Sequence, residues 1–173
     1  MPGIILSIDQ GTTGTTVVLL DQELNIRAQG YREFGQIYPQ PGWVEHNPDE
    51  IWDSVLGAMT AAFSSGDISP ADVGAIGITN QRETNLIWDK VTGKPCHNAI
   101  VWQCRRTADI CEQLKQEGRE ELFHSKTGLL LDPYFSGTKL KWQFDHVSGL
   151  REDAENGKVI AGTIDTFLVW KLT

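Results

Sequence analysis

A carboxylate, a glycine and two hydroxyls follow one another near the amino terminus, in the segment Asp9-Gln10-Gly11-Thr12-Thr13. The glycine lets the backbone come close to a ligand, and the amides and hydroxyls of such a turn can cradle phosphate oxygens. Asp9 can hold a magnesium ion, directly or through water, because hard cations prefer carboxylate oxygens. The pattern G-x-x-x-x-G-K-[ST] is absent, which excludes a P-loop. A polar β-turn with an incidental aspartate has the same residues, so the motif alone leaves both interpretations open.

A second polar segment, residues 79–84 (TNQRET), comes at the end of an apolar run over 73–79. Ligands of open α/β sheets bind beyond the carboxyl ends of the strands. The adjacent Arg82 and Glu83 would offer such a ligand a donor beside an acceptor. A solvated loop with a surface ion pair is the commoner explanation of this composition, and such a pair contributes little stability.

Two aromatic residues stand beside polar groups. Trp102 opens the segment 102–106 (WQCRR), and Tyr134 lies in the turn-like segment 132–136 (DPYFS), just before a predicted helix. Aromatic side chains next to a few polar groups are typical of small-molecule pockets. The alternative is that Trp102 belongs to the core and that Tyr134 packs as a half-buried aromatic residue.

The other reactive side chains suggest no site. The four histidines are scattered, with no acid or thiol at catalytic or ligand spacing: His46, His97, His124 and His146. The three cysteines are Cys96, Cys104 and Cys111, and their odd number and spacing argue against a disulfide framework or a zinc site. Reduced thiols in a cytoplasmic protein are therefore expected.

The composition is that of a packed globular protein, with 40% hydrophobic and 22% charged residues among 173. Fifteen Lys and Arg against 23 Asp and Glu give a net charge of −8. Because no segment gathers basic residues, nucleic acid is not an expected partner. No apolar run approaches the roughly 18–20 residues of a membrane span, so no membrane is expected either. The apolar start, residues 1–8, lacks a basic region and predicts a strand, not a signal peptide.

Three strands are predicted to carry the first motif, over residues 4–8, 15–20 and 25–31. Their short connections indicate an antiparallel meander. Residues 35–46 predict an extended, ordered loop. A helix then begins after Asn47, a suitable N-cap, with Pro48 at its first position and Glu50 three residues after the cap, and it ends at Gly66. Helical spacing predicts that one apolar face of it is buried: Ile51, Trp52, Val55, Met59, Ala62 and Phe63.

The rest of the chain predicts a buried strand over 73–79, shorter strands over 85–88 and 99–102, and helices over 105–117, 136–147 and 163–172. In the helix over 136–147, Leu140, Phe144 and Val147 are expected to face inward. This order is an α/β fold that differs from the alternating βα units of a dinucleotide-binding fold. The last helix is apolar on nearly every side and reaches Thr173 without a cap, which predicts a buried helix and a chain that has been cut short.

Five segments occur together in an order found in a known family. They are DQGTT at 9–13, REF-GQIYP-PGWVEHNP at 32–48, AIGITNQRET at 75–84, TGKP-NAIVWQCRRTA at 92–108 and TGL-DPYFSGTKLKW at 127–142. Over essentially its whole length the chain resembles the FGGY carbohydrate kinases. The segments at 75–84 and 98–108 resemble most the branch of that family that phosphorylates glycerol.

The resemblance implies an actin-like, ribonuclease H-like ATPase fold, and transfer of the γ-phosphoryl group of ATP to glycerol with Mg²⁺, giving sn-glycerol 3-phosphate. It implies that Asp9 faces the metal and that Thr12, Thr13 and Gly14 lie at the nucleotide. Glycerol would be held by four residues: Arg82, Glu83, Trp102 and Tyr134.

The resemblance also implies what the chain lacks. Residues 1–173 would be part of the amino-terminal kinase domain, with the aspartate general base beyond Thr173 and the second domain absent. The chain alone would then be inactive, although the whole enzyme is expected to be a cytoplasmic homo-oligomer.

One position departs from the family, since Thr16 stands where an arginine usually approaches the nucleotide. Three alternatives stay open. They are a kinase of a related polyol or sugar, a nucleotide-binding module without catalysis, and an inactive fragment.

Overall fold

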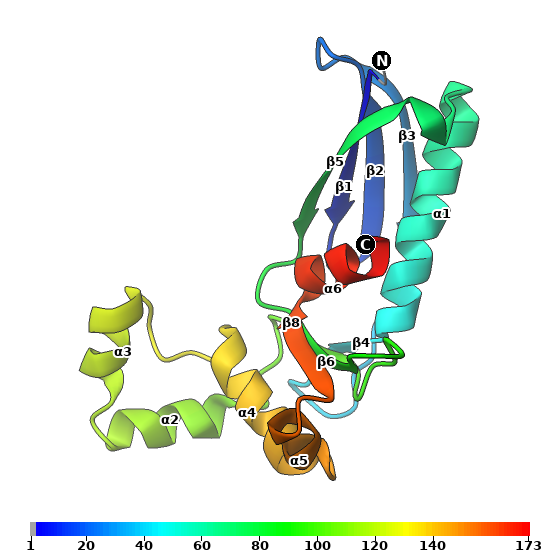
Figure 1. Ribbon diagram of the computed structural model, residues 1–173. Helices are drawn as coiled ribbons and strands as arrows, with labels where there is room; N and C mark the ends of the chain where they lie inside the picture. The colour runs from blue at the N-terminus through cyan, green and yellow to red at the C-terminus, as the bar shows by residue number, and fades with distance from the viewer. Residues whose placement is uncertain (1–2) are drawn as a thin grey trace. The chain divides into compact units, whose positions relative to one another are not determined.

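The computed structural model describes residues 3–173, which divide into two compact units (Figure 1). Unit 1 contains the chain up to Gln36, Asn47–Gln81 and Ile164–Thr173. Unit 2 contains Ile37–His46 and Arg82–Thr163. Each unit is therefore assembled from segments that are far apart in the sequence.

Unit 1 is built on a four-stranded sheet in the order β3-β2-β1-β5. The strands are β1 (Ile4–Gln10), β2 (Gly14–Leu20), β3 (Ile26–Glu33) and β5 (Val73–Asn80). The first three pair antiparallel in sequence order, which confirms the predicted meander. β5 pairs parallel to β1, so their carboxyl ends, Gln10 and Asn80, lie side by side.

Helix α1 (Pro48–Gly66) packs against this sheet, most closely against β3. Its start is as predicted, because the Asn47 side chain accepts a hydrogen bond from the Asp49 amide. Its buried face is turned slightly from the predicted one: Ile51, Ser54, Val55, Ala58 and Ala62 are buried, whereas Trp52, Met59 and Phe63 are half-buried. The small residues Ser54 and Ala58 let the helix lie close to the strands.

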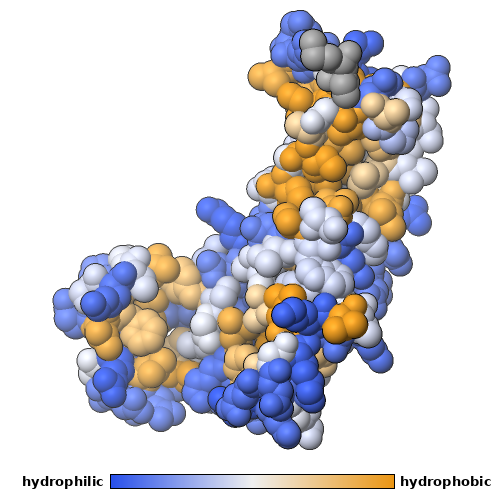
Figure 2. All heavy atoms as spheres, in the orientation of Figure 1, coloured by the Kyte–Doolittle hydropathy of each residue, from blue (hydrophilic) through white to orange (hydrophobic). Residues whose placement is uncertain are grey.

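The strand predicted over 73–79 is present as β5, but the prediction that this strand is buried is wrong. In the described residues β5 pairs with β1 alone, and Ile76 is 48% exposed. Figure 2 shows hydrophobic side chains gathered over the strands of unit 1 on the face toward the viewer. A short 3-10 helix, η1 (Pro70–Asp72), precedes β5.

The last helix, α6 (Ile164–Leu172), belongs to unit 1. Ile164, Phe167 and Leu168 are buried, but Val169 is 49% exposed. The helix was expected to be buried all round, and only one side of it is.

Unit 2 contains a second sheet in the order β4-β7-β6-β8. Its strands are β4 (Glu45–His46), β6 (Asn85–Asp89), β7 (Ala99–Ile100) and β8 (Val159–Thr163). Its helices are α2 (Ala108–Gln116), α3 (Glu120–Thr127), α4 (Ser136–His146) and α5 (Leu150–Glu155). β4, β8, α3 and α5 were not predicted, and β4 lies in the segment 35–46 that was expected to be a loop.

An arginine is buried in unit 2. The Arg106 side chain is fully buried, and its guanidinium lies 4.0 Å from the ring centre of Trp43 and 4.5 Å from that of Trp142. It donates to Glu45 at 2.7 Å. A charged side chain is tolerated at such a position because it is both paired and stacked on aromatic faces. These contacts order the loop before α1, and the Trp43 ring in that loop packs against the Arg106 guanidinium.

Among the helices formed by residues 3–173, none has both the length and the apolar character that crossing a membrane requires.

Candidate active site

The segment 11–13 forms a tight connection between β1 and β2 in unit 1. The Gly11 amide donates to the Gly14 carbonyl at 2.9 Å, which closes the turn. The carbonyls of Thr12 and Thr13 accept from the Gln36 side chain and the Phe34 amide. The carbonyls of the turn are thus engaged inside the protein, and hydroxyl and amide groups are the kind of group in such a turn that suits an anion.

Gly14 is buried in β2, and a side chain there would lie 2.6 Å from the Tyr31 hydroxyl and 2.8 Å from the Arg32 carbonyl. The close approach of β3 therefore explains why this residue is glycine. A contact between its backbone and a nucleotide stays a prediction.

Asp9 has an exposed side chain near the end of β1. Its neighbours across the sheet are Thr16 in β2 and Thr79 in β5, so the carboxylate is flanked by two hydroxyl residues. In residues 3–173 no cluster of three metal-ligating side chains occurs. One carboxylate suits Mg²⁺, because that ion is often held by one or two protein carboxylates together with substrate phosphates.

Two buried glutamines support the turn from below. The Gln81 side chain donates to the Gln10 side chain at 3.0 Å and to the Gly11 carbonyl at 3.2 Å. The main-chain amide of Gln81 donates to the main-chain carbonyl of Gln10 at 2.7 Å. Neither glutamine was predicted to be a functional residue. The sequence feature that could have identified Gln10 and Gln81 is the position of each at the carboxyl end of an apolar strand.

Glu83 follows in unit 2 with a left-handed backbone, at φ 65°. Residues other than glycine rarely adopt this conformation, and such strain is often found at functional sites. The Glu83 Oε2 atom accepts from the amide of Ser136 at 2.8 Å and from its hydroxyl at 2.7 Å. Ser136 is the first residue of α4, where the helix dipole favours a negative charge. Glu83 is thus held in one orientation.

The two predicted aromatic residues lie together in unit 2. The rings of Trp102 and Tyr134 meet edge to face, with centres 5.9 Å apart. The Trp102 amide donates to the Thr84 hydroxyl, next to Glu83, at 3.2 Å. Arg82 precedes Glu83 and is exposed. The structure therefore brings Glu83, Trp102 and Tyr134 into one neighbourhood and leaves the Arg82 side chain accessible.

A row of polar side chains lies on the buried face of α4, where Leu140, Phe144 and Val147 were expected. Lys139, Trp142 and Gln143 are the buried residues of this helix, and the three predicted apolar residues are half-buried. Gln143 donates to the Asn85 side chain at 3.0 Å, and Asn85 donates to the Ser136 carbonyl at 3.0 Å. The first turn of α4 is therefore fixed from within.

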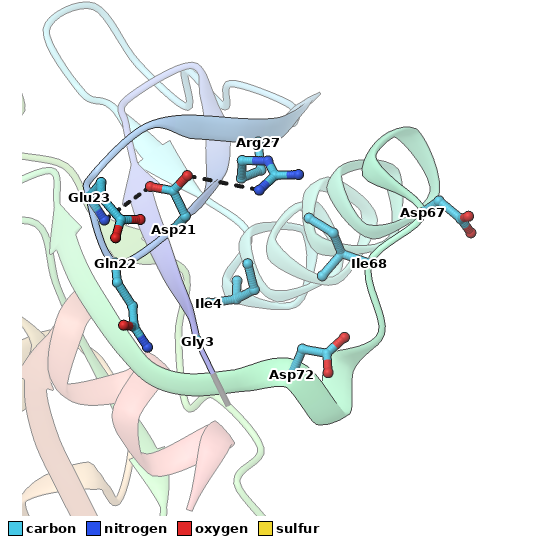
Figure 3. A pocket seen from close by; sticks show the side chains of 9 residues that line it. All are labelled: Gly3, Ile4, Asp21, Gln22, Glu23, Arg27, Asp67, Ile68 and Asp72. Atoms are coloured by element: carbon cyan, nitrogen blue, oxygen red, sulfur yellow. Dashed lines mark hydrogen bonds and ion pairs between the residues drawn. The ribbon is translucent and has the colours of Figure 1, made fainter. Parts of the chain in front are cut away.

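A hollow of about 370 Å³ lies at the opposite end of the unit 1 sheet from the Gly11–Thr13 turn (Figure 3). Four of the residues that line it are acidic and one is an arginine. The lining residues are Gly3, Ile4, Asp21, Gln22, Glu23, Arg27, Asp67, Ile68 and Asp72. Hydrogen bonds from Asn25 and Glu23 lower the pKa of Asp21, which also lies 3.9 Å from Arg27. In Figure 3 the carboxylates of Asp67 and Asp72 lie apart from that of Asp21. The acids do not converge on one point.

The chain belongs to the FGGY family of carbohydrate kinases, since the sequence profile of the N-terminal domain of that family matches residues 4–173. The chain is 59% identical over 169 residues to a glycerol kinase of Halothermothrix orenii and 58% identical over 173 residues to one of Geobacillus sp.. These matches cover 98% and 100% of this chain, but 34% and 35% of the relatives. The chain therefore spans about a third of their length.

Solved structures agree with this assignment. The chain superposes with a TM-score of 0.91 and 35% identity on Plasmodium falciparum glycerol kinase with ADP, covering 98% of this chain and 34% of that one. A gluconate kinase of Lactobacillus acidophilus has a TM-score of 0.82 at 21% identity, covers 96% of this chain and 32% of that one, and shows the shared fold alone. The expected α/β, actin-like fold is confirmed.

Proposed function

We propose that the protein carrying this chain is a glycerol kinase, which transfers the γ-phosphoryl group of ATP to glycerol and forms sn-glycerol 3-phosphate. The observation that carries the proposal is the cluster in unit 2, where the anchored carboxylate of Glu83 lies beside the Trp102–Tyr134 pair. The identity to glycerol kinases over the whole of this chain supports it.

The residue types suit a small triol. Burying three carbons contributes only about 0.8 kcal/mol each, whereas millimolar binding needs about 4 kcal/mol. Directed hydrogen bonds must supply the rest, and those to charged groups are worth roughly 1.5–3 kcal/mol each. In this proposal Arg82 donates to glycerol hydroxyls, Glu83 accepts from one, and Trp102 covers the carbon chain. Tyr134 adds a hydroxyl that both donates and accepts.

On the nucleotide side, Thr12, Thr13 and the Gly14 backbone would bind phosphate oxygens, and Asp9 would hold Mg²⁺. The ion, when bound, neutralises charge on the phosphates. The chain's own part is to present one carboxylate and a row of hydroxyls in a turn held rigid by Gln10 and Gln81. Phosphoryl transfer depends on such positioning and charge stabilisation.

We propose further that residues 1–173 are part of the amino-terminal kinase domain, and that the general base and the second domain lie outside them. The three free cysteines fit a reducing compartment, which supports a cytoplasmic location. Assembly of the whole enzyme into a homo-oligomer is part of the same proposal.

A coupled assay tests the activity. The whole protein, with ATP and Mg²⁺, should phosphorylate glycerol with a kcat/KM at least tenfold above that for five- and six-carbon sugars and polyols. A higher kcat/KM for a sugar than for glycerol would mean that the sugar is the substrate. ATP binding without turnover of any polyol would indicate a non-catalytic module instead.

A further inference from the structure

Lys139 is a lysine with no exposed surface. It lies on α4 in unit 2, among the largest fully buried side chains of the described chain. Lysines are almost never fully buried unless they are paired. The Nζ atom of Lys139 donates to the carbonyl oxygens of Pro133, at 3.4 Å, and of Tyr134. The buried ammonium thus lies beneath the turn that carries Tyr134.

This turn is fixed at each end. The Asp132 carboxylate accepts from the Tyr134 amide at 2.8 Å, and the Asp132 carbonyl accepts from the Phe135 amide at 3.2 Å. The next residue, Ser136, holds the Glu83 carboxylate. Lys139 therefore contacts the short segment that places both the Tyr134 ring and the anchor of Glu83.

Stability does not explain this lysine well. Burial lowers the pKa of Lys139 to about 8, and the negative charge of Glu83 acts in the opposite direction. Removing an ammonium from water is unfavourable, and an apolar side chain of similar volume is often at least as stable at a buried ionic position. Two backbone carbonyls pointing at one cation indicate a role in fixing the backbone.

We propose that Lys139 is a positioning residue of the glycerol site, which holds the 133–134 carbonyls so that Tyr134 and Glu83 keep the orientation that binds the substrate. The inference rests on the proposed function for its substrate. Lys139 touches no reacting atom in this scheme, and it acts through Tyr134 and Ser136.

The test compares Lys139→Met with Lys141→Met in the whole protein. Lys141 is on the same helix, but its side chain is 57% exposed and pairs with Asp145. Lys139→Met should raise the KM for glycerol about tenfold or more and leave the KM for ATP within twofold, because small misplacements of binding groups have large effects. Lys141→Met should change neither. Equal changes in both KM values, or no change, would overturn the proposal.

A double-mutant cycle with Tyr134→Phe tests the route. If Lys139 acts through Tyr134, the combined variant should raise the glycerol KM by less than the product of the single effects. An increase in the glycerol KM equal to the product of the two single effects would mean that Lys139 does not act through Tyr134, which contradicts the proposal. Lys139→Gln, which keeps an N–H donor without the charge, takes the place of Lys139→Met if the latter does not fold.

Hydrogen exchange separates this inference from the proposed function, because it needs no substrate. The amides of Tyr134 and Ser136 should exchange faster in Lys139→Met than in the unchanged protein or in Lys141→Met. Faster exchange in a protein that does not phosphorylate glycerol would refute the proposed substrate and keep the positioning role. Unchanged exchange would refute the positioning role in a protein that does phosphorylate glycerol.

Discussion

Asp9 lies directly opposite Thr16 in the β1–β2 ladder, so their side chains project from the same face of the unit 1 sheet. A carboxylate at this position has the hydroxyl of a threonine as its cross-strand neighbour. The charge of Asp9 is therefore not offset by a cation at that neighbouring position, which favours its use for a metal ion.

We expect Asp9→Asn to lower kcat in the whole protein by at least about tenfold, with the glycerol KM within twofold of its original value. The amide has no charge to attract Mg²⁺, whereas the unit 2 residues proposed for glycerol are unchanged. Steady-state kinetics over a range of Mg²⁺ concentrations would measure this. Asp72→Asn, at the opposite end of the sheet, is the matched control and should behave as the unchanged protein. A kcat equal to that of the control would remove Asp9 from the site.

Arg82→Ala should reduce kcat/KM for glycerol by about ten- to a hundredfold, since a hydrogen bond from a charged group is worth roughly 1.5–3 kcal/mol. The KM for ATP should change far less. Arg119→Ala removes an exposed arginine elsewhere in unit 2 and serves as the control. If glycerol kinetics were unaffected by Arg82→Ala, the assignment of this residue would be wrong.

Stability should fall as the pH drops below about 6.5, in part because of His46. This side chain is fully buried in β4, and burial lowers its pKa from 6.5 to about 4. Between these values the unfolded chain binds a proton that the folded chain does not, so each pH unit removes up to about 1.4 kcal/mol. His46→Gln should show a shallower loss of unfolding free energy from pH 6.5 to 4 than the unchanged chain. His124→Gln, at an exposed position of α3, should show the original slope. If the unchanged chain, His46→Gln and His124→Gln lost unfolding free energy with the same slope against pH, the burial argument would be contradicted.

Gly30→Ala should destabilise unit 1. A Cβ at this position would lie 2.1 Å from the Ala58 carbonyl oxygen, so α1 would have to move away from β3. Overpacking of this kind costs about 1–3 kcal/mol or more. Gly77→Ala in β5 is the control, because no atom lies within 4 Å of its new methyl group. Thermal unfolding should show a lower Tm for Gly30→Ala and an unchanged or slightly raised Tm for Gly77→Ala. An unchanged Tm in Gly30→Ala would show that the contact between the helix and the sheet is loose.

The elements with strong local signals could be predicted from the sequence. The meander follows from two apolar runs and a weakly alternating segment with short turns between them. Helix α1 follows from Asn47, Pro48 and the spacing of its apolar residues. β8 could not be predicted in the same way. It has five residues, includes Gly162, and pairs with β6, from which it is far away in the sequence. Its partner is decided by the tertiary fold.

The candidate site shows the same limit. Glu83, Trp102 and Tyr134 could be proposed from the sequence because their residue types and neighbours suggest a ligand, and their assignment to the site stays a prediction. Lys139 was missed, since a lysine in an amphipathic helix is normally assigned to the solvent side. Its position three residues before the buried Trp142 was the available signal. What places it inside is a pair of backbone carbonyls, which no side-chain pattern reveals.

The pairing of β6 with β8 also sets the order in which unit 2 can form during synthesis. About 70 residues separate Asp89 from Val159, and at about 5–20 residues per second the ribosome needs roughly 4–14 seconds to make them. Until then β6, whose first four residues are buried in the finished fold, lacks its longest partner strand. An unpaired apolar strand is a site of aggregation. During this interval the nascent chain can therefore aggregate through β6, and ribosome-bound chains that end just before β8 should depend more on chaperones than chains that include β8.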